Sequence, residues 1–200
     1  GRTAQAHTHI SLFPIMSIIK MSLMTGPYSM TLNQRGIDKQ AIATYAAKYA
    51  EKHNEEFRFY FLNDEYGADC ANFVSQAMLV GGWIPIQGFY RSVDSWWYDS
   101  SLIWPNASRT WINVEDFIKF ALRQHRIQRV KEVSDLVLGD IVAADFNPEN
   151  KDGLEHIMIV SKKDVITGEL SFSYHSPNTK DKSFVEIRKN NPNANFYAFS

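Results

Sequence analysis

The sequence predicts an α+β fold in which N-terminal helices pack on a C-terminal antiparallel sheet. Two observations predict it. Apolar residues recur at helical spacing in the first part of the chain, and strand-like runs then follow one another from residue 136 to the end. Helices followed by consecutive strands are typical of α+β folds, and strands joined by short turns form an antiparallel meander.

Three segments show the three-and-four spacing of apolar residues that is typical of amphipathic helices: 37–53, 70–80 and 113–126. The second helix is expected to begin after Asp69, a good N-cap residue, and to stop at Gly81 and Gly82. Between the helices, the aromatic run 57–62 weakly favours an extended segment. Residues 83–111 are rich in Trp, Tyr, Ser and Gly and indicate a long ordered loop.

Five segments have the composition and apolar runs of strands: 136–146, 156–164, 169–176, 183–188 and 195–200. The second and third are expected to pair as a hairpin across the turn at residues 162–168. In the second strand, Ile157 and Ile159 should point to one face of the sheet, and Met158 and Val160 to the other.

The composition predicts one folded domain and excludes some partners. The chain has 200 residues, 44% of them hydrophobic, and a net charge of -1 with its 21 basic residues dispersed, which argues against binding nucleic acid. The apolar stretch 10–24 is interrupted by Pro14 and Lys20 and is too short for a spanning helix, so stable membrane insertion is not expected. We interpret residues 1–30 as a leader, a linker or an artificial arm, and residues 31–200 as the domain.

Cys70 is the only cysteine in the chain, so the fold does not depend on an intramolecular disulfide. It falls in the first turn of the second helix, where the helix dipole lowers a thiol pKa and favours the nucleophilic thiolate. The alternative is that Cys70 is a small buried apolar residue. A nucleophilic thiol also needs an imidazole within hydrogen-bonding reach and a third group that orients this imidazole.

Two of the six histidines are candidates for that imidazole. The other four lie in the N-terminal arm or at polar helix ends: His7, His9, His53 and His125. His156 opens the apolar strand HIMIV and His175 ends the next strand, SFSYHS. If the two strands pair, both histidines lie toward the same end of the sheet. Cys70, His156 and His175 could instead bind zinc, but no HExxH or CxxC spacing supports this.

Tryptophans crowd the loop region between the second and third helices: Trp83, Trp96, Trp97, Trp104 and Trp111. Aromatic faces can stack on sugars or line a peptide groove, whereas the alternative is that they pack the loop onto the helices. Trp96 and Trp97 are adjacent, so we expect at most one of them to be buried and the other to be the better substrate contact. The acidic segment 145–153 lacks the EF-hand spacing and is interpreted as a solvated loop, not as a calcium site.

Several blocks resemble one known family, in the same order along residues 37–190: DCANFVSQAMLVGG, SWWYDSSLIWPNASRTWINVEDFIKF, LVLGDIVAADF, EHIMIV and SYHSPNT. They are similar to the putative-amidase domain of bacterial cell-wall proteins, among the papain-like, CHAP-related cysteine hydrolases. The resemblance implies a papain-like fold without a cofactor or metal.

Carried onto this chain, the resemblance implies that Cys70 is the nucleophile and His156 the base. His175 would orient the imidazole, and Asn178 is the competing orienting residue. The backbone N–H of Cys70 is a natural donor to the oxyanion. Asp140 would anchor backbone at a turn. A second oxyanion donor is open among three residues: Tyr60, Asn63 and Tyr66.

The substrate contacts predicted with Trp96 and Trp97 are Tyr66 and Asp69, although Asp69 is interpreted first as a helix cap. The function implied is hydrolysis of an amide bond in peptidoglycan through a thioacyl-enzyme, by an N-acetylmuramoyl-L-alanine amidase or a peptidoglycan endopeptidase. Such a protein would be secreted or associated with the cell envelope. Two alternatives stay open: a non-catalytic module that binds wall peptide or a protein, and an acyl transferase on the same fold.

Overall fold

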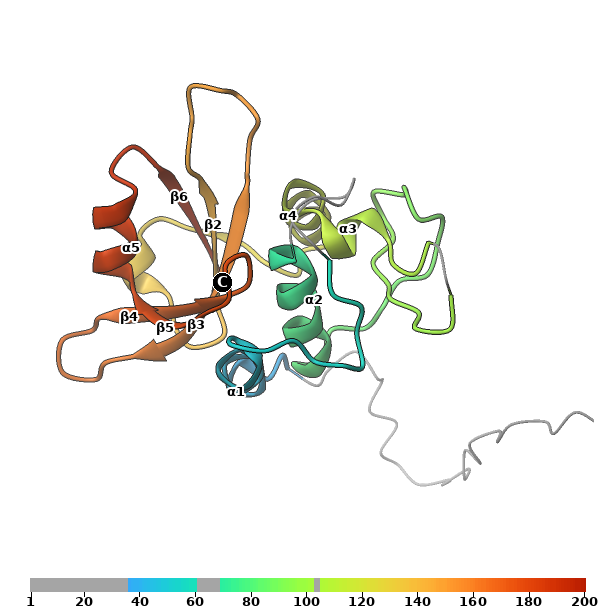
Figure 1. The fold of residues 1–200 in the computed structure, drawn as a ribbon, viewed down its shortest axis with the longest axis horizontal. Coiled ribbons are helices and arrows are strands. Elements are labelled where there is room, and N and C mark those ends of the chain that lie inside the picture. Colours follow the sequence, from blue (N-terminus) through green and yellow to red (C-terminus); the bar gives the residue numbers. More distant parts are fainter. Residues whose placement is uncertain (1–35, 61–68, 103–104) are drawn as a thin grey trace, which may run out of the picture. The chain divides into compact units, whose positions relative to one another are not determined.

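The computed structural model describes residues 36–60, 69–102 and 105–200. The chain divides into residues 1–34 and 35–200, and all that follows concerns the second unit. The predicted arm over residues 1–30 lies outside the described residues. The second unit has the predicted α+β architecture, with its longer helices before an antiparallel sheet of six strands (Figure 1).

The three predicted helices are confirmed, and the structure adds two short ones: α1 Lys39–Tyr49, α2 Cys70–Val80, α3 Arg109–Ile112, α4 Val114–Arg123 and α5 Phe184–Asn190. Asp38 and Asn113 cap α1 and α4 by accepting backbone N–H groups with their side chains. Asp69 occupies the N-cap position of α2 but makes no side-chain capping hydrogen bond. The predicted helix start after Asp69 is therefore confirmed, but the carboxylate does not cap the helix, because it is engaged elsewhere.

The sheet contains the following strands: β1 Arg129–Val130, β2 Ile141–Asp145, β3 His156–Lys163, β4 Leu170–Tyr174, β5 Thr179–Ser183 and β6 Asn195–Phe199. A 3-10 turn, η1, covers Val133–Asp135. Strands β2 to β5 form the expected meander, and β3 and β4 pair antiparallel with Ile159 opposite Ser173. The chain then returns across the sheet, because β6 lies between β1 and β2 in the strand order β1-β6-β2-β3-β4-β5.

The strand predicted over residues 183–188 is wrong. The structure has helix α5 there, and Ser183 caps it by accepting the backbone N–H of Glu186. Phe184 and Ile187 recur three residues apart, which suits one face of a helix as well as it suits a short apolar strand. The strand in this region, β5, is the polar sequence TKDKS at the sheet edge, where no apolar alternation marks it.

Two hydrophobic cores lie on the two faces of the sheet. The helix-side core includes Ile42, Phe73, Phe117, Ile157 and Ile159. The far-side core includes Val142, Met158, Val160, Phe172 and Ile187. Figure 1 shows α1 to α4 on one side of the sheet and α5 on the other. The predicted alternation along β3 is confirmed, since its odd-numbered isoleucines and its even-numbered Met and Val enter different cores.

The loop predicted over residues 83–111 is largely confirmed for its described part. Isolated bridges join Ile86 to Trp96 and Tyr98 to Ala107, and α3 occupies the end of the region. Of the aromatic run 57–62, residues 57–60 form no helix or strand. Further backbone hydrogen bonds order the described part of the loop, among them Asp99 N–H to the Asn106 carbonyl at 2.9 Å and Arg109 N–H to the Tyr90 carbonyl at 2.7 Å.

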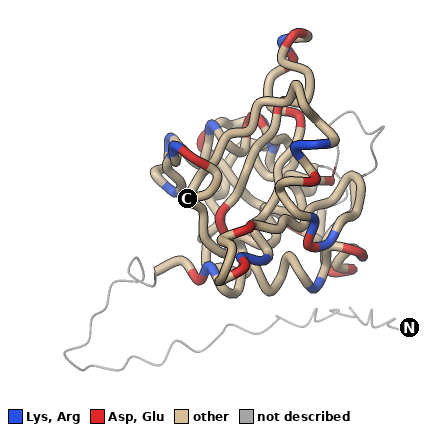
Figure 2. The backbone as a smooth tube through the Cα atoms, turned by 90° about the vertical axis from the view of Figure 1, so that its left-hand side faces the viewer, with Lys and Arg blue, Asp and Glu red and all other residues tan. Residues whose placement is uncertain are grey.

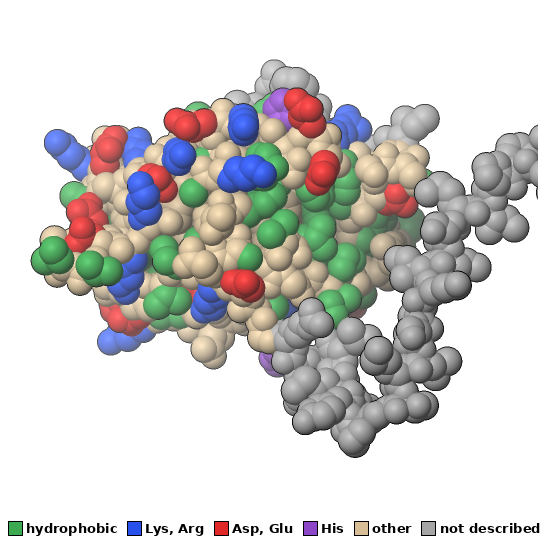
Figure 3. Space-filling model, turned by 90° about the horizontal axis from the view of Figure 1, so that it is seen from below, with side chains coloured by type: hydrophobic (Ala, Val, Ile, Leu, Met, Phe, Trp, Pro, Cys, Tyr) green, Lys and Arg blue, Asp and Glu red, His purple; other side chains and the backbone are tan. Residues whose placement is uncertain are grey.

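Charged residues of both signs are interspersed along the described chain (Figure 2). On the face seen in Figure 3, positive and negative side chains also lie among apolar ones. This agrees with the net charge of -1. Within the described ranges, every helix is too short or too polar to cross a bilayer.

Candidate active site

Cys70 is the first residue of α2 and is 1% exposed. Backbone N–H groups of Ala71 and Ile157 act on the sulfur and favour the thiolate, but burial outweighs them and raises the pKa of Cys70 to about 12. The expectation of a lowered thiol pKa is therefore wrong for this conformation. Loss of water disfavours the charged form more strongly than the helix dipole and the backbone amides of Ala71, Ile157 and Cys70 itself favour it. At neutral pH Cys70 is a thiol.

His156 is the first residue of β3 and is 5% exposed. Its ring packs edge-on against Tyr174, with centroids 4.9 Å apart, and lies 5.7 Å from the ring of Phe146. Burial lowers the pKa of His156 to about 4, so the imidazole is neutral at pH 7. Its Nε2 atom is buried and has no hydrogen-bond partner. A buried polar atom of this kind needs an explanation, because leaving it unpaired is unfavourable.

The side chains of Cys70 and His156 face opposite sides of the sheet. Cys70 belongs to the helix-side core. His156 is directly opposite Ala144, and residues opposite each other in an antiparallel pair share a face. Ala144 and Tyr174 both belong to the far-side core, so the imidazole points there. The backbone at the start of β3 thus lies at Cys70, but the ring of His156 does not. The pairing of Cys70 as nucleophile with His156 as base stays a prediction.

His175 lies on the helix side and contacts Asp69. Its Nδ1 is 2.5 Å from Asp69 Oδ2, its Nε2 is 2.8 Å from the backbone oxygen of Tyr49, and its ring stacks on Phe73 with centroids 4.2 Å apart. Both ring nitrogens therefore have partners other than His156. The prediction that His175 orients the His156 imidazole is left without a contact to support it in this conformation.

The other predicted site residues are dispersed. Asn178 is exposed in the turn between β4 and β5, and Tyr66 lies outside the described residues. Trp96 and Trp97 are both buried, and their indole N–H groups donate to Ser75 and to the Gly88 carbonyl. The expectation that at most one of the two would be buried is wrong, because Trp96 enters the helix-side core while Trp97 packs within the loop. Neither indole offers a face to a substrate in this conformation.

Asn72 is a site residue that the sequence reasoning missed. Its Nδ2 donates to Asp69 Oδ1 at 2.8 Å and to the Arg58 carbonyl at 2.9 Å, and its Oδ1 accepts the Trp111 indole N–H at 2.8 Å. It lies three residues after Asp69, and side chains at that spacing share one helix face. The motif Asp-Cys-x-Asn therefore carried a signal for this contact.

Asp140 anchors a turn, as predicted. Its Oδ2 accepts the backbone N–H of Val137 at 2.8 Å and its Oδ1 accepts from Lys39 Nζ at 2.6 Å. Over the described part of the chain, no three His, Cys, Asp or Glu side chains gather where they could hold a metal ion. The zinc set of Cys70, His156 and His175 is accordingly not assembled in this conformation.

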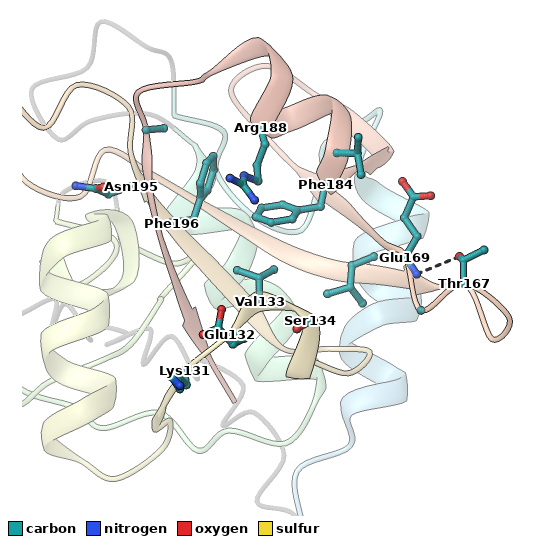
Figure 4. A pocket seen from close by; sticks show the side chains of 14 residues that line it. Lys131, Glu132, Val133, Ser134, Thr167, Glu169, Phe184, Arg188, Asn195 and Phe196 are labelled. Carbon is teal, nitrogen blue, oxygen red and sulfur yellow. Dashed lines mark hydrogen bonds between the residues drawn. The ribbon is translucent and has the colours of Figure 1, made fainter.

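A pocket of about 700 Å³ opens away from all these residues, on the far side of the sheet. Val133, Leu170, Phe184, Arg188 and Phe196 are among its lining residues. Figure 4 shows the Arg188 side chain beside the two phenyl rings. None of the residues predicted for the site lines this pocket, and no motif in the sequence indicated it.

Comparisons with known proteins agree with the resemblance of the sequence blocks. Residues 36–199 match the family described as "Putative amidase domain". The chain is also similar to two Bacillus subtilis proteins, uncharacterized protein YhbB (26% identical over 127 residues, 64% of this chain) and uncharacterized protein YjcM (30% identical over 155 residues, 72% of this chain). These matches span 38% and 32% of the two relatives, and no solved structure matches the chain significantly. The family match covers most of the described unit, and the chain belongs to the putative amidase domain family.

Proposed function

We propose that this chain is a cysteine-dependent amide hydrolase in which Cys70 attacks the carbonyl carbon and His156 carries the proton. The observation that carries the proposal is the position of Cys70. It begins the buried helix α2, and its sulfur meets the backbone N–H of Ile157 at the start of β3, next to His156. Membership of an amidase family supports the reaction class.

The proposed substrate is an amide bond in peptidoglycan, either the muramoyl–alanine bond or a bond of the stem or cross-bridge peptides. The sequence resemblance to cell-wall proteins supports this substrate, and with it a secreted or envelope-associated location. Hydrolysis by a cysteine needs no metal or cofactor, because the thiol supplies the nucleophile and the imidazole moves the proton.

The reaction runs in two steps, acylation of Cys70 and hydrolysis of the thioacyl-enzyme. A bond forms between Cys70 Sγ and the carbonyl carbon, the carbon–nitrogen bond breaks, and the thiol proton passes through the His156 imidazole to the leaving amine. Water then attacks the thioacyl group, gives a proton to the same ring, and releases the acid and the thiol. A thiol pKa of about 12 and an imidazole pKa of about 4 leave both groups neutral at pH 7. These pKa values belong to the conformation in which the two side chains are apart; once the imidazole contacts the thiol, it acts as a general base that takes the proton as the sulfur attacks.

The proposal requires His156, the first residue of β3, to leave its pairing with Ala144 so that its side chain can turn from the far side of the sheet toward Cys70 when substrate binds. His156 is the first residue of β3 and follows the largely exposed loop 147–155, so few backbone pairs precede it in the strand. Its unpartnered Nε2 supports the move, because the sulfur would give that nitrogen the hydrogen bond it lacks. Asn178, exposed beyond β4, is then a candidate for orienting the ring.

The test is hydrolysis of purified peptidoglycan, followed by mass spectrometry of the fragments to identify the bond that is cut. Cys70→Ala should abolish hydrolysis. His156→Ala should lower the rate by roughly 10²–10⁴-fold, which is the usual contribution of a general base. His53→Ala is the matched control, since His53 is exposed, and it should keep full activity. Activity that survives in Cys70→Ala would contradict the proposal.

A non-catalytic module that binds wall peptide is the second candidate. The observation that favours it is the burial of Cys70 together with the placement of His156 on the other face of the sheet. If the wild-type protein sediments with intact peptidoglycan and releases no fragments, this reading replaces the hydrolase. Products that carry an added amine would indicate acyl transfer instead.

A further inference from the structure

His175 and Asp69 form a buried pair beside the proposed nucleophile. Each side chain is 1% exposed, and Nδ1 and Oδ2 are 2.5 Å apart. Asp69 immediately precedes Cys70, and His175 follows the last residue of β4. The pair therefore links the start of the nucleophile's helix to the sheet without involving His156.

The hydrogen-bond partners of the pair determine its protons. The backbone oxygen of Tyr49, 2.8 Å from Nε2 of His175, can only accept, so Nε2 carries a hydrogen. Nδ1 and Asp69 Oδ2 cannot both be bare at 2.5 Å, because two acceptors would repel each other, so one proton lies between them. Imidazolium with carboxylate and imidazole with carboxylic acid both satisfy this count. In either case the pair has no net charge.

The other contacts of Asp69 leave it little freedom. Its Oδ1 accepts the backbone N–H of Tyr60 at 3.0 Å and the Asn72 side-chain amide at 2.8 Å. Its own backbone N–H donates to Ser176 Oγ at 3.1 Å, in the residue after His175. The turn that follows β4 therefore holds the start of α2 at two points. His175 contacts the side chain of Asp69, and Ser176 accepts its backbone N–H.

The charge of Asp69 matters to Cys70 because the two residues are adjacent. A carboxylate next to a thiol opposes its ionisation, and Asp69 is one of the groups that act in this direction on Cys70. A shared proton from His175 cancels that charge within the buried region, where charges interact strongly. The ring of His175 also stacks on Phe73, one turn further along α2.

We propose that His175 is a positioning residue for Cys70, which acts by sharing one proton with Asp69 and by holding the start of α2, and not by orienting His156. The inference rests on the proposed role of Cys70 as the nucleophile. The contacts of both ring nitrogens of His175, with Asp69 and with the Tyr49 carbonyl, support this role.

The first test is a charge-rescue series read by alkylation of Cys70 with iodoacetamide at one fixed pH. His175→Gln leaves the Asp69 carboxylate uncompensated and should slow alkylation about tenfold, the effect of roughly one unit in the thiol pKa. Asp69→Asn combined with His175→Gln also removes the carboxylate and should restore most of the rate. His125→Gln, at an exposed histidine, is the control and should match the wild type.

A role confined to packing predicts the opposite order, because the double variant loses more contacts and should be at least as impaired as His175→Gln. That order would overturn the inference, as would faster alkylation in His175→Gln. The readout does not require hydrolysis. If alkylation follows the predicted series while Cys70→Ala still hydrolyses peptidoglycan, the pair is supported and the proposed function fails. If hydrolysis depends on Cys70 but the alkylation rates of the variants do not follow the predicted order, the inference on His175 is wrong and the proposed function stands.

The second test uses the unaltered protein, in case His175→Gln does not fold. Nitrogen-15 NMR of the histidine rings reports which nitrogens carry protons. We expect a protonated Nε2 on His175, and an Nδ1 that is either protonated or accepts a hydrogen bond from Asp69. An unprotonated Nε2 would overturn the proton count and the proposal with it.

Discussion

His156 couples folding to pH at the scale of one residue. Its imidazole is buried without a charged partner, and burial lowers its pKa from 6.5 to about 4. Between these pH values the unfolded chain binds a proton at His156 that the folded protein does not bind. The folded state therefore loses stability as the pH falls from about 6.5 to about 4, by up to roughly 3 kcal/mol in total.

The corresponding prediction uses His156→Gln, which keeps a polar side chain but cannot titrate. Its free energy of unfolding should depend less on pH than that of the wild type, so the difference between the two proteins should change steadily between pH 6.5 and pH 4. Urea unfolding at several pH values measures this. His53→Gln, at an exposed position, should follow the wild-type pH dependence. Parallel curves for the wild type and His156→Gln would show that the ring is not buried as described.

The turn before β2 packs against the start of α1 at the scale of secondary-structure elements. Gly139 has a φ of +80°, and a Cβ atom there would lie 2.3 Å from the backbone oxygen of Lys39. Asp140 accepts a hydrogen bond from the Lys39 side chain in the same region. The helix and the strand therefore approach closely at a position where only glycine fits.

Gly139→Ala should destabilise the protein more than Gly168→Ala. Gly168 also has a positive φ, +74°, but a Cβ there meets no atom within 4 Å. Gly168→Ala should lower the unfolding free energy by about 1–2 kcal/mol through backbone strain alone. Gly139→Ala should add about 1–3 kcal/mol from the clash with backbone. Thermal denaturation compares the two, and equal effects would contradict the close approach.

The two cores share one sheet, so the described unit should unfold as a whole. Phe117 lies fully buried in the helix-side core and Phe172 in the far-side core. Each Phe→Ala variant should lose about 3–5 kcal/mol of stability, because each leaves a cavity in a packed interior. Both should show one cooperative transition by circular dichroism and by tryptophan fluorescence. Transitions that differ between the two probes would mean that the faces unfold separately.

Much of the fold followed from local patterns. Apolar residues recur along one face of each of the helices α1, α2 and α4, and they enter both faces of the sheet along β3. Each of these patterns can be recognised within a single segment of sequence. Local patterns do not indicate β5, because an edge strand can be polar on both faces, and they do not separate α5 from a strand, because Phe184 and Ile187 fit both periods. Local patterns also do not indicate that β6 pairs with β2, because pairing between strands distant in sequence leaves no local signal.

The sequence by itself determined the α+β class, the place of Cys70 at a helix start, and the two histidines at the ends of neighbouring strands. Only the tertiary structure decided which way those histidines face. With Ile159 opposite Ser173, His175 shares the helix side and His156 does not. The physical reason is that side chains alternate along a strand, so a register shift of one residue exchanges the two faces, and register depends on contacts remote in sequence.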